Sequence, residues 1–96
     1  MHPTPILVDQ TFVNVGMFAQ GQEVLTHKHK RAGYFLIAHG TMRVSHFELS
    51  SIHTGPALVR LEADKNYKLE CISPLAIVSC IHHLEPGETY PPIEEA

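Results

Sequence analysis

The sequence predicts an all-β fold, a small antiparallel β-barrel built as a single domain. Short runs of alternating apolar and polar residues, such as Val13 to Met17, are separated by turn-forming residues. No stretch has the apolar spacing of a helix, and the dipeptide His39-Gly40 suits a two-residue turn between two strands. The chain has 96 residues, which is the length of one domain.

The strands are expected to follow one another closely along the chain. The first is a short apolar edge strand at Ile6–Val8, preceded by two prolines. The others are expected at Thr11–Phe18, Glu23–Lys30, Tyr34–Ala38, Thr41–Phe47, Ala57–Leu61, Tyr67–Ile72 and Ala76–His82, with a loop at Glu48–Pro56. Alternation predicts that the inward side chains are Val13, Val15, Met17, Leu25, Phe35, Ile37, Met42, Val44, Val59, Leu61, Leu69, Val78 and Cys80.

The turn at His39-Gly40 predicts a hairpin between the strands on either side of it. In a two-residue hairpin Ala38 faces Thr41, and counting outward from there places Gly33 opposite His46. Both positions share the inward face. His46 is therefore expected to project into the space beside Gly33, either as a ligand or as a hydrogen-bonded histidine near the barrel mouth.

Composition excludes some classes of partner and compartment. The net charge is −3 with neutral histidines, and the short basic run at residues 27–31 is isolated, which excludes nucleic acid as a partner. No apolar run is long enough to span a membrane, and the N-terminus lacks a signal-peptide pattern. Cys71 and Cys80 are expected to be buried thiols, so a cytoplasmic location is expected.

Two histidines one residue apart, His27 and His29, form the most informative local pattern. Alternate side chains of a strand point to the same face, so the two imidazoles share one surface. They can hold one metal ion or one anionic ligand there. The alternative is a pair of polar residues facing outward, because Lys28 and Lys30 already place a solvated face on this strand.

The spacing around this pair resembles the first motif of the cupin superfamily. That motif reads Gly, five residues, His-x-His, three or four residues, Glu, six residues, Gly. Gly21, His27, His29 and Gly40 match it in register, whereas Gly33 occupies the Glu position. The resemblance covers residues 15–83 and implies a small antiparallel jelly-roll barrel of the RmlC-like type. In that family a metal is often held by the two histidines, the Glu and a fourth histidine from a second motif.

The second cupin motif is matched only in its pattern of strands and turns. Counting from Gly55 places Asn66 in its histidine position, and a shift of one residue places Tyr67 there. The closing strand, which ends in Cys-Ile-His-His, resembles the end of small metal-binding cupins. Depending on the length of the preceding loop, either His82 or His83 reaches the face that carries Tyr67.

Two functions remain in competition at the sequence level. In the first, His27 and His29, with His82 or His46, bind a divalent ion such as Zn, Fe, Ni or Mn. In the second, the metal has been lost and a small ligand, sensed or sequestered, is bound by the histidine-lined cavity. That ligand set also includes Tyr67, Arg43 and Arg60. The sequence does not decide whether the protein is an enzyme.

Domain limits and assembly follow from the same features. Residues 1–86 are expected to form the cupin-like domain, and residues 87–96 a proline-rich, acidic surface tail. A chain this short buries only about two-thirds of its unfolded surface, so a homodimer or higher oligomer is expected.

Overall fold

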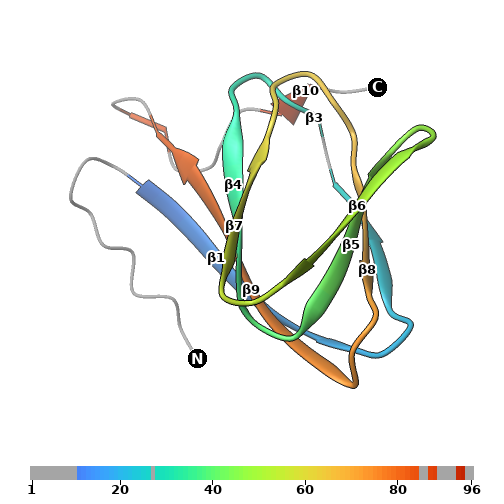
Figure 1. The fold of residues 1–96 in the computed structure, drawn as a ribbon. Coiled ribbons are helices and arrows are strands. Elements are labelled where there is room, and N and C mark those ends of the chain that lie inside the picture. Colours follow the sequence, from blue (N-terminus) through green and yellow to red (C-terminus); the bar gives the residue numbers. More distant parts are fainter. Residues whose placement is uncertain (1–10, 27, 85–86, 89–92, 95–96) are drawn as a thin grey trace.

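The computed structural model describes residues 11–26, 28–84, 87–88 and 93–94, and these contain only strands (Figure 1). The strands are β1 (Thr11–Ala19), β2 (Glu23–Leu25), β3 (Lys28–His29), β4 (Gly33–His39), β5 (Thr41–His46), β6 (Leu49–Thr54), β7 (Ala57–Leu61), β8 (Lys68–Cys71), β9 (Leu75–His83) and β10 (Ile93–Glu94). The all-β prediction is confirmed. Across this described part of the chain, no helix is long and apolar enough to cross a membrane.

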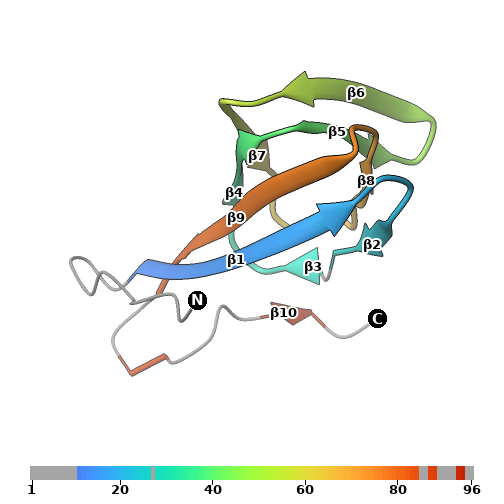
Figure 2. The same cartoon turned by 90° about the horizontal axis from the view of Figure 1, so that it is seen from below.

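The strands form two four-stranded antiparallel sheets that face each other (Figures 1 and 2). The first sheet has the order β1-β9-β4-β7 and the second has the order β2-β8-β5-β6. A separate two-stranded ladder joins β3 to β10, so the segment expected as a surface tail contributes a strand. The architecture is a jelly-roll sandwich in which the two sheets are not joined into a continuous barrel.

The core lies between the sheets at the end away from β3. Phe35 and Ile37 from β4 are fully buried there against Met42 from β5 and Leu69 and Cys71 from β8. The alternation in these strands therefore predicted their inward faces correctly. Among the remaining predicted inward residues, Val44, Leu61 and Val78 are buried, and Val59 and Cys80 pack against the core while partly buried. Both cysteines are free thiols.

The predicted hairpin between β4 and β5 is wrong, because these strands lie in different sheets. β4 pairs with β7 and β9, whereas β5 pairs with β6 and β8. Gly40 (φ +91°) packs so closely on β9 that an added Cβ would lie 2.3 Å from the Leu75 carbonyl oxygen. The chain therefore crosses from one sheet to the other at Gly40 instead of folding back. Gly33 lies opposite Leu61, and His46 lies opposite Leu49.

The face of β1 was also predicted wrongly. Phe12, Asn14, Gly16 and Phe18 point between the sheets, so Val13, Val15 and Met17 point outward. Met17 is 66% exposed. The prediction chose the more apolar face, but the inner wall at this end of the sandwich bounds a cavity and tolerates small and polar side chains.

Two further expectations about strands need correction. The segment expected as one strand, Glu23–Lys30, is divided into β2 and β3, and Leu25 is 75% exposed rather than inward. The segment expected as a loop, Glu48–Pro56, contains the edge strand β6. Its side chains are mostly exposed, and β6 has a neighbouring strand on one side only.

Candidate functional site

A cavity of about 230 Å³ lies between the sheets at the end marked by β3. Its apolar wall includes Phe18, Phe35, Leu69 and Val78. Polar side chains from several elements complete the lining. They are Asn14, Thr26, His29, Arg31, Glu62, Lys65, Tyr67 and His82. The cavity thus combines an apolar interior with a polar group of residues.

His29 and His82 are in direct ring contact inside this cavity. Their ring centroids are 4.2 Å apart and their planes are tilted by 38°. His82 is buried, with 8% of its surface exposed, whereas its neighbour His83 is exposed. Burial, with a smaller contribution from His29, lowers the pKa of His82 from its ordinary 6.5 to about 4. His82 is therefore a neutral imidazole at pH 7.

Gly33 makes room for the ring of His82. A Cβ added at Gly33 would lie 2.5 Å from both Cε1 and Nδ1 of that ring. The position that the cupin motif gives to Glu therefore faces His82, not His46 as the hairpin had predicted. Any side chain at Gly33 would displace the ring, so the missing Glu and the buried histidine are two aspects of one packing arrangement.

Arg31 reaches the same end of the cavity from the segment after β3. Its Nη2 donates a hydrogen bond of 3.2 Å to the carbonyl oxygen of His83, and it forms an ion pair with Glu88. These contacts fix the guanidinium next to the end of β9. Arg31 is thus a fixed cationic group, paired with Glu88, in the same cavity lining as His29 and His82.

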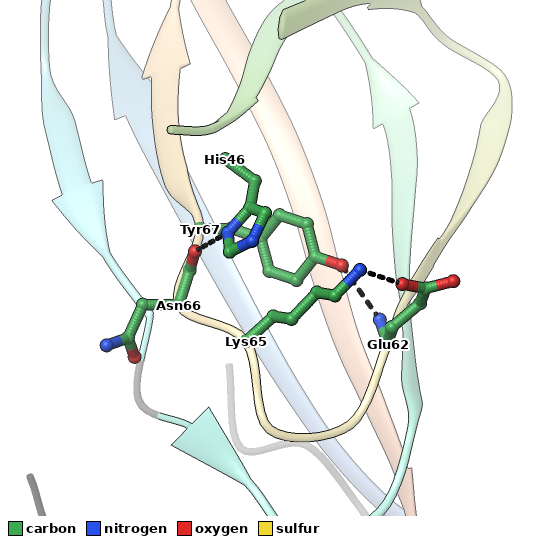
Figure 3. Close-up of polar contacts among 5 residues, drawn as sticks. All are labelled: His46, Glu62, Lys65, Asn66 and Tyr67. Carbon is green, nitrogen blue, oxygen red and sulfur yellow. Dashed lines mark hydrogen bonds and ion pairs between the residues drawn. The ribbon is translucent and has the colours of Figure 1, made fainter. Parts of the chain in front are cut away.

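Tyr67 lines the cavity, and its hydroxyl group points toward the backbone of Glu62 (Figure 3). The backbone N–H of Glu62 donates a 3.0 Å hydrogen bond to this hydroxyl, so the hydroxyl proton stays available for another acceptor. Two hydrogen bonds join the backbone of Tyr67 to Thr26. The N–H of Thr26 donates to the carbonyl oxygen of Tyr67, and the N–H of Tyr67 donates to Oγ1 of Thr26. Glu62 also pairs with Lys65, and this hydrogen bond lowers the pKa of the Glu62 carboxyl.

Three residues predicted for the site lie outside the cavity. Nδ1 of His46 is 2.7 Å from the carbonyl oxygen of Asn66, which can only accept, so Nδ1 carries the proton (Figure 3). Arg43 pairs with Glu70 at 3.0 Å on the outer face of the second sheet. Arg60 is exposed on β7, on the face opposite to that of its buried neighbour Leu61. The sequence could not place these three because their positions depend on which strands share a sheet.

The described residues do not complete a metal site. His27 lies outside the described residues, so its place relative to His29 stays a prediction. Within the described ranges, no group of three or more His, Cys, Asp or Glu side chains is arranged to hold an ion. Two imidazoles fall short of the three protein ligands of typical catalytic zinc sites. The described donor set therefore does not fit a metal by itself.

Sequence reasoning missed several cavity residues. Arg31 had a usable signal, since it follows His29 by two residues and alternation places both on one side. Phe12 and Asn14 were missed because the opposite face of β1 is more apolar. Lys65 lies in the turn between β7 and β8, and no motif marks it.

Comparison with known proteins identifies the fold. No protein-family model matches the sequence, and no curated protein matches it significantly. Among solved structures, a cupin superfamily protein from Desulfitobacterium hafniense is similar with a TM-score of 0.69 and 14% identity, over 80% of this chain and 70% of that one. A protein from Shewanella frigidimarina that contains a cupin-2 domain gives 0.67 and 9% identity, over 79% and 72%.

The chain has a cupin fold. A third similar structure is the Cupin_2 domain of an XRE family transcriptional regulator from Enterobacter cloacae, with a TM-score of 0.66 and 15% identity over 80% of this chain and 85% of that one. The resemblance seen in the first motif is therefore confirmed for the fold. At these identities the likeness carries the cupin architecture and no particular activity.

Proposed function

We propose that this cupin binds one small molecule in the cavity between its sheets. The ligand has a compact apolar body and one anionic or hydrogen-bond-accepting group. The observation that carries the proposal is the joint presence of an apolar wall, a buried neutral His82 and a fixed Arg31 around one cavity of about 230 Å³. Ligand sites usually combine an apolar lining with a few convergent polar groups.

The apolar part of the cavity supports a compact ligand. Phe18, Phe35, Leu69 and Val78 offer aromatic and branched aliphatic surface, which favours a ring or a short chain. The volume of about 230 Å³ lies just below the range that is usual for small-molecule pockets, which runs from about 300 to 1,000 Å³. A polymer or a large cofactor is therefore a poor fit.

The polar end supports an acceptor group on the ligand. The hydroxyl of Tyr67 has a proton to donate, and the guanidinium of Arg31 is a charged donor. The rings of His29 and His82, which are in contact with each other, add nitrogen atoms to the same cavity lining. A carboxylate on the ligand would be balanced by the charge of Arg31. Its binding would not require His82 to become a second buried cation.

Binding is favoured over catalysis by the state of the one carboxylate that lines the cavity in the described structure. Glu62 is engaged with Lys65, and this hydrogen bond lowers its pKa, which makes it a weak general base at neutral pH. A sensing or sequestering function is therefore proposed.

The test is titration calorimetry with benzoate, benzamide and hexanoate on the wild type, His82→Ala and His83→Ala. His83 is the matched control, because it adjoins His82 but its side chain is exposed. Benzoate and hexanoate should bind the wild type and His83→Ala, and benzamide should bind more weakly. His82→Ala should weaken binding about tenfold, which corresponds to about 1.4 kcal/mol. Equal binding by both variants, or none by the wild type at millimolar concentration, would contradict the proposal.

Metal binding is a second candidate, and it requires a donor from outside the described residues to join His29 and His82, whose rings are in contact. A bound divalent ion would act there as a Lewis acid. Metal analysis of untagged protein dialysed against Zn²⁺ tests it, with His29→Ala compared with His53→Ala on β6. This function predicts one ion per chain, lost in His29→Ala, kept in His53→Ala and released as pH falls through about 6. If the wild type takes up no metal but binds benzoate, ligand binding is the one candidate function that remains.

A further inference from the structure

The short stretch that carries His29 and Arg31 is held by the C-terminal segment, whose described parts are Gly87, Glu88 and β10. β3 belongs to neither four-stranded sheet, and its partner strand is β10. In this antiparallel ladder Ile93 lies opposite His29. Figures 1 and 2 both show β10 beside β3 and outside the two large sheets. The C-terminal segment therefore lies against the strand that carries the cavity residue His29.

Glu88 of this segment contacts the guanidinium of Arg31 directly. Nη2 of Arg31 donates one hydrogen bond to the carboxylate of Glu88 and another, of 3.2 Å, to the carbonyl oxygen of His83. The side chains of Arg31 and Glu88 are 33% and 26% exposed, so water screens their charges only in part. Arg31 lines the cavity, whereas Glu88 is not one of the described residues in that lining. Glu88 therefore holds the guanidinium from outside the cavity.

The charges of the cavity lining are already balanced in this arrangement. Within the described structure, the arginine and lysine of the lining are Arg31 and Lys65. Lys65 pairs with Glu62, and Arg31 pairs with Glu88. A ligand carboxylate would therefore enter a lining in which each of these cations has a carboxylate partner. Burying a further anion without a partner is costly, so the ligand must displace one of the two carboxylates.

We infer that Glu88 competes with the anionic group of the ligand for Arg31, so that the C-terminal segment regulates the cavity. This inference rests on the proposed function. When the ligand carboxylate binds the guanidinium, Glu88 leaves it, and the C-terminal segment loses its ion pair with the cavity lining. The segment thus acts as a latch that lowers the affinity of the cavity for anions and is released when an anion binds.

The opposite role for Glu88 is to support Arg31 in the position that binds the ligand. Two observations favour competition over support. The hydrogen bond from Nη2 to the carbonyl oxygen of His83 comes from the backbone of β9, so it still orients the guanidinium after Glu88 leaves. The carboxylate of Glu88 also neutralises the charge of Arg31 that would attract an anionic ligand. The two roles predict opposite effects of removing the charge of Glu88.

The first test is titration calorimetry of the full chain with benzoate and with neutral benzamide, on the wild type, Glu88→Gln and Glu70→Gln. Glu70 is the matched control, because it pairs with Arg43 on the outer face of the second sheet and is 27% exposed, close to Glu88. Glu88→Gln should bind benzoate about fivefold more tightly, which corresponds to about 1 kcal/mol, the upper end for an exposed ion pair. Its affinity for benzamide, and both affinities of Glu70→Gln, should equal those of the wild type.

The second test follows the C-terminal segment itself, by hydrogen–deuterium exchange and mass spectrometry of the full chain. Without ligand, peptides that cover residues 87–96 should exchange faster in Glu88→Gln than in the wild type, because the ion pair with Arg31 is lost. Coupling between two equilibria is reciprocal, so saturating benzoate should accelerate exchange of this segment in the wild type by up to the same factor of about five. Benzamide should not accelerate it.

The outcomes separate the latch from the proposed function. If the wild type binds benzoate and Glu88→Gln binds it equally or more weakly, the latch is overturned and ligand binding stands. If neither binds benzoate at millimolar concentration, both proposals are overturned. A gain in affinity that Glu70→Gln shares would reflect net charge and would also overturn the latch. If Glu88→Gln does not fold, exchange in the wild type decides: acceleration by benzoate supports the latch, and unchanged exchange contradicts it.

Discussion

Gly33 and His82 occupy complementary space, and this predicts a strong coupling between substitutions at the two positions. In Gly33→Ala the new Cβ would lie 2.5 Å from two atoms of the His82 ring and 3.0 Å from the carbonyl oxygen of Ile81. Normal contact begins near 3.4 Å, so the ring must move away by about 1 Å, and overpacking of this kind costs about 1–3 kcal/mol. The displaced ring would also lose its contact with His29.

The expected free energies follow from removing the ring. In the His82→Ala background the same Gly33→Ala change should cost less than about 1 kcal/mol, because the two closest contacts are gone and the nearest one known to remain is the Ile81 carbonyl at 3.0 Å. The coupling energy should therefore be about 1–2 kcal/mol in favour of the double variant. Urea unfolding of the wild type, both single variants and the double variant measures it.

Gly16 provides the matched control on the same cavity wall. A Cβ there would meet the ring of Phe18 at 3.5 Å, which is ordinary contact. Gly16→Ala should change the free energy of unfolding by less than about 1 kcal/mol, and it should show no coupling to His82→Ala. Additive effects of Gly33→Ala and His82→Ala would refute the packing described here, and would place the His82 ring elsewhere.

Three other predictions concern the backbone, the pH dependence and the core. Gly40→Ala should destabilise the protein far more than Gly21→Ala, because both have positive φ but only Gly40 lies against backbone atoms; similar urea midpoints for the two would contradict this. The pKa of His82 is lowered to about 4, so unfolding takes up a proton between pH 6.5 and 4. Stability should therefore be constant for this group above pH 6.5 and fall below it by up to about 1.4 kcal/mol per pH unit. His82→Phe should flatten that slope in melts across this range, and an unchanged slope would show that another group causes it. Ile37→Asp should prevent folding, because it buries an unpaired charge at a fully buried position; a cooperative melt by circular dichroism would refute this.

The sequence by itself determined the strands and much of the inward face. Alternation in β4, β5, β8 and β9 identified buried residues such as Phe35 and Leu69, because a strand with one face in the core leaves a period of two. The spacing of Gly21, His29 and Gly40 indicated the cupin fold, which the solved structures confirm. These features are local or have fixed spacing, so they can be recognised without the partner strands.

Only the tertiary structure decided which strands share a sheet and which side chains meet. The hairpin prediction placed His46 beside Gly33. In the structure Gly40 packs closely against β9 and the chain crosses into the other sheet, so β4 and β5 do not pair. The ring beside Gly33 is that of His82. The inward face of β1 was misjudged for a related reason. Period two shows that a strand has two faces, but which face is inside depends on what packs against each one. For β1 a partly polar cavity lies inside, and its apolar side faces away from the chain's own core.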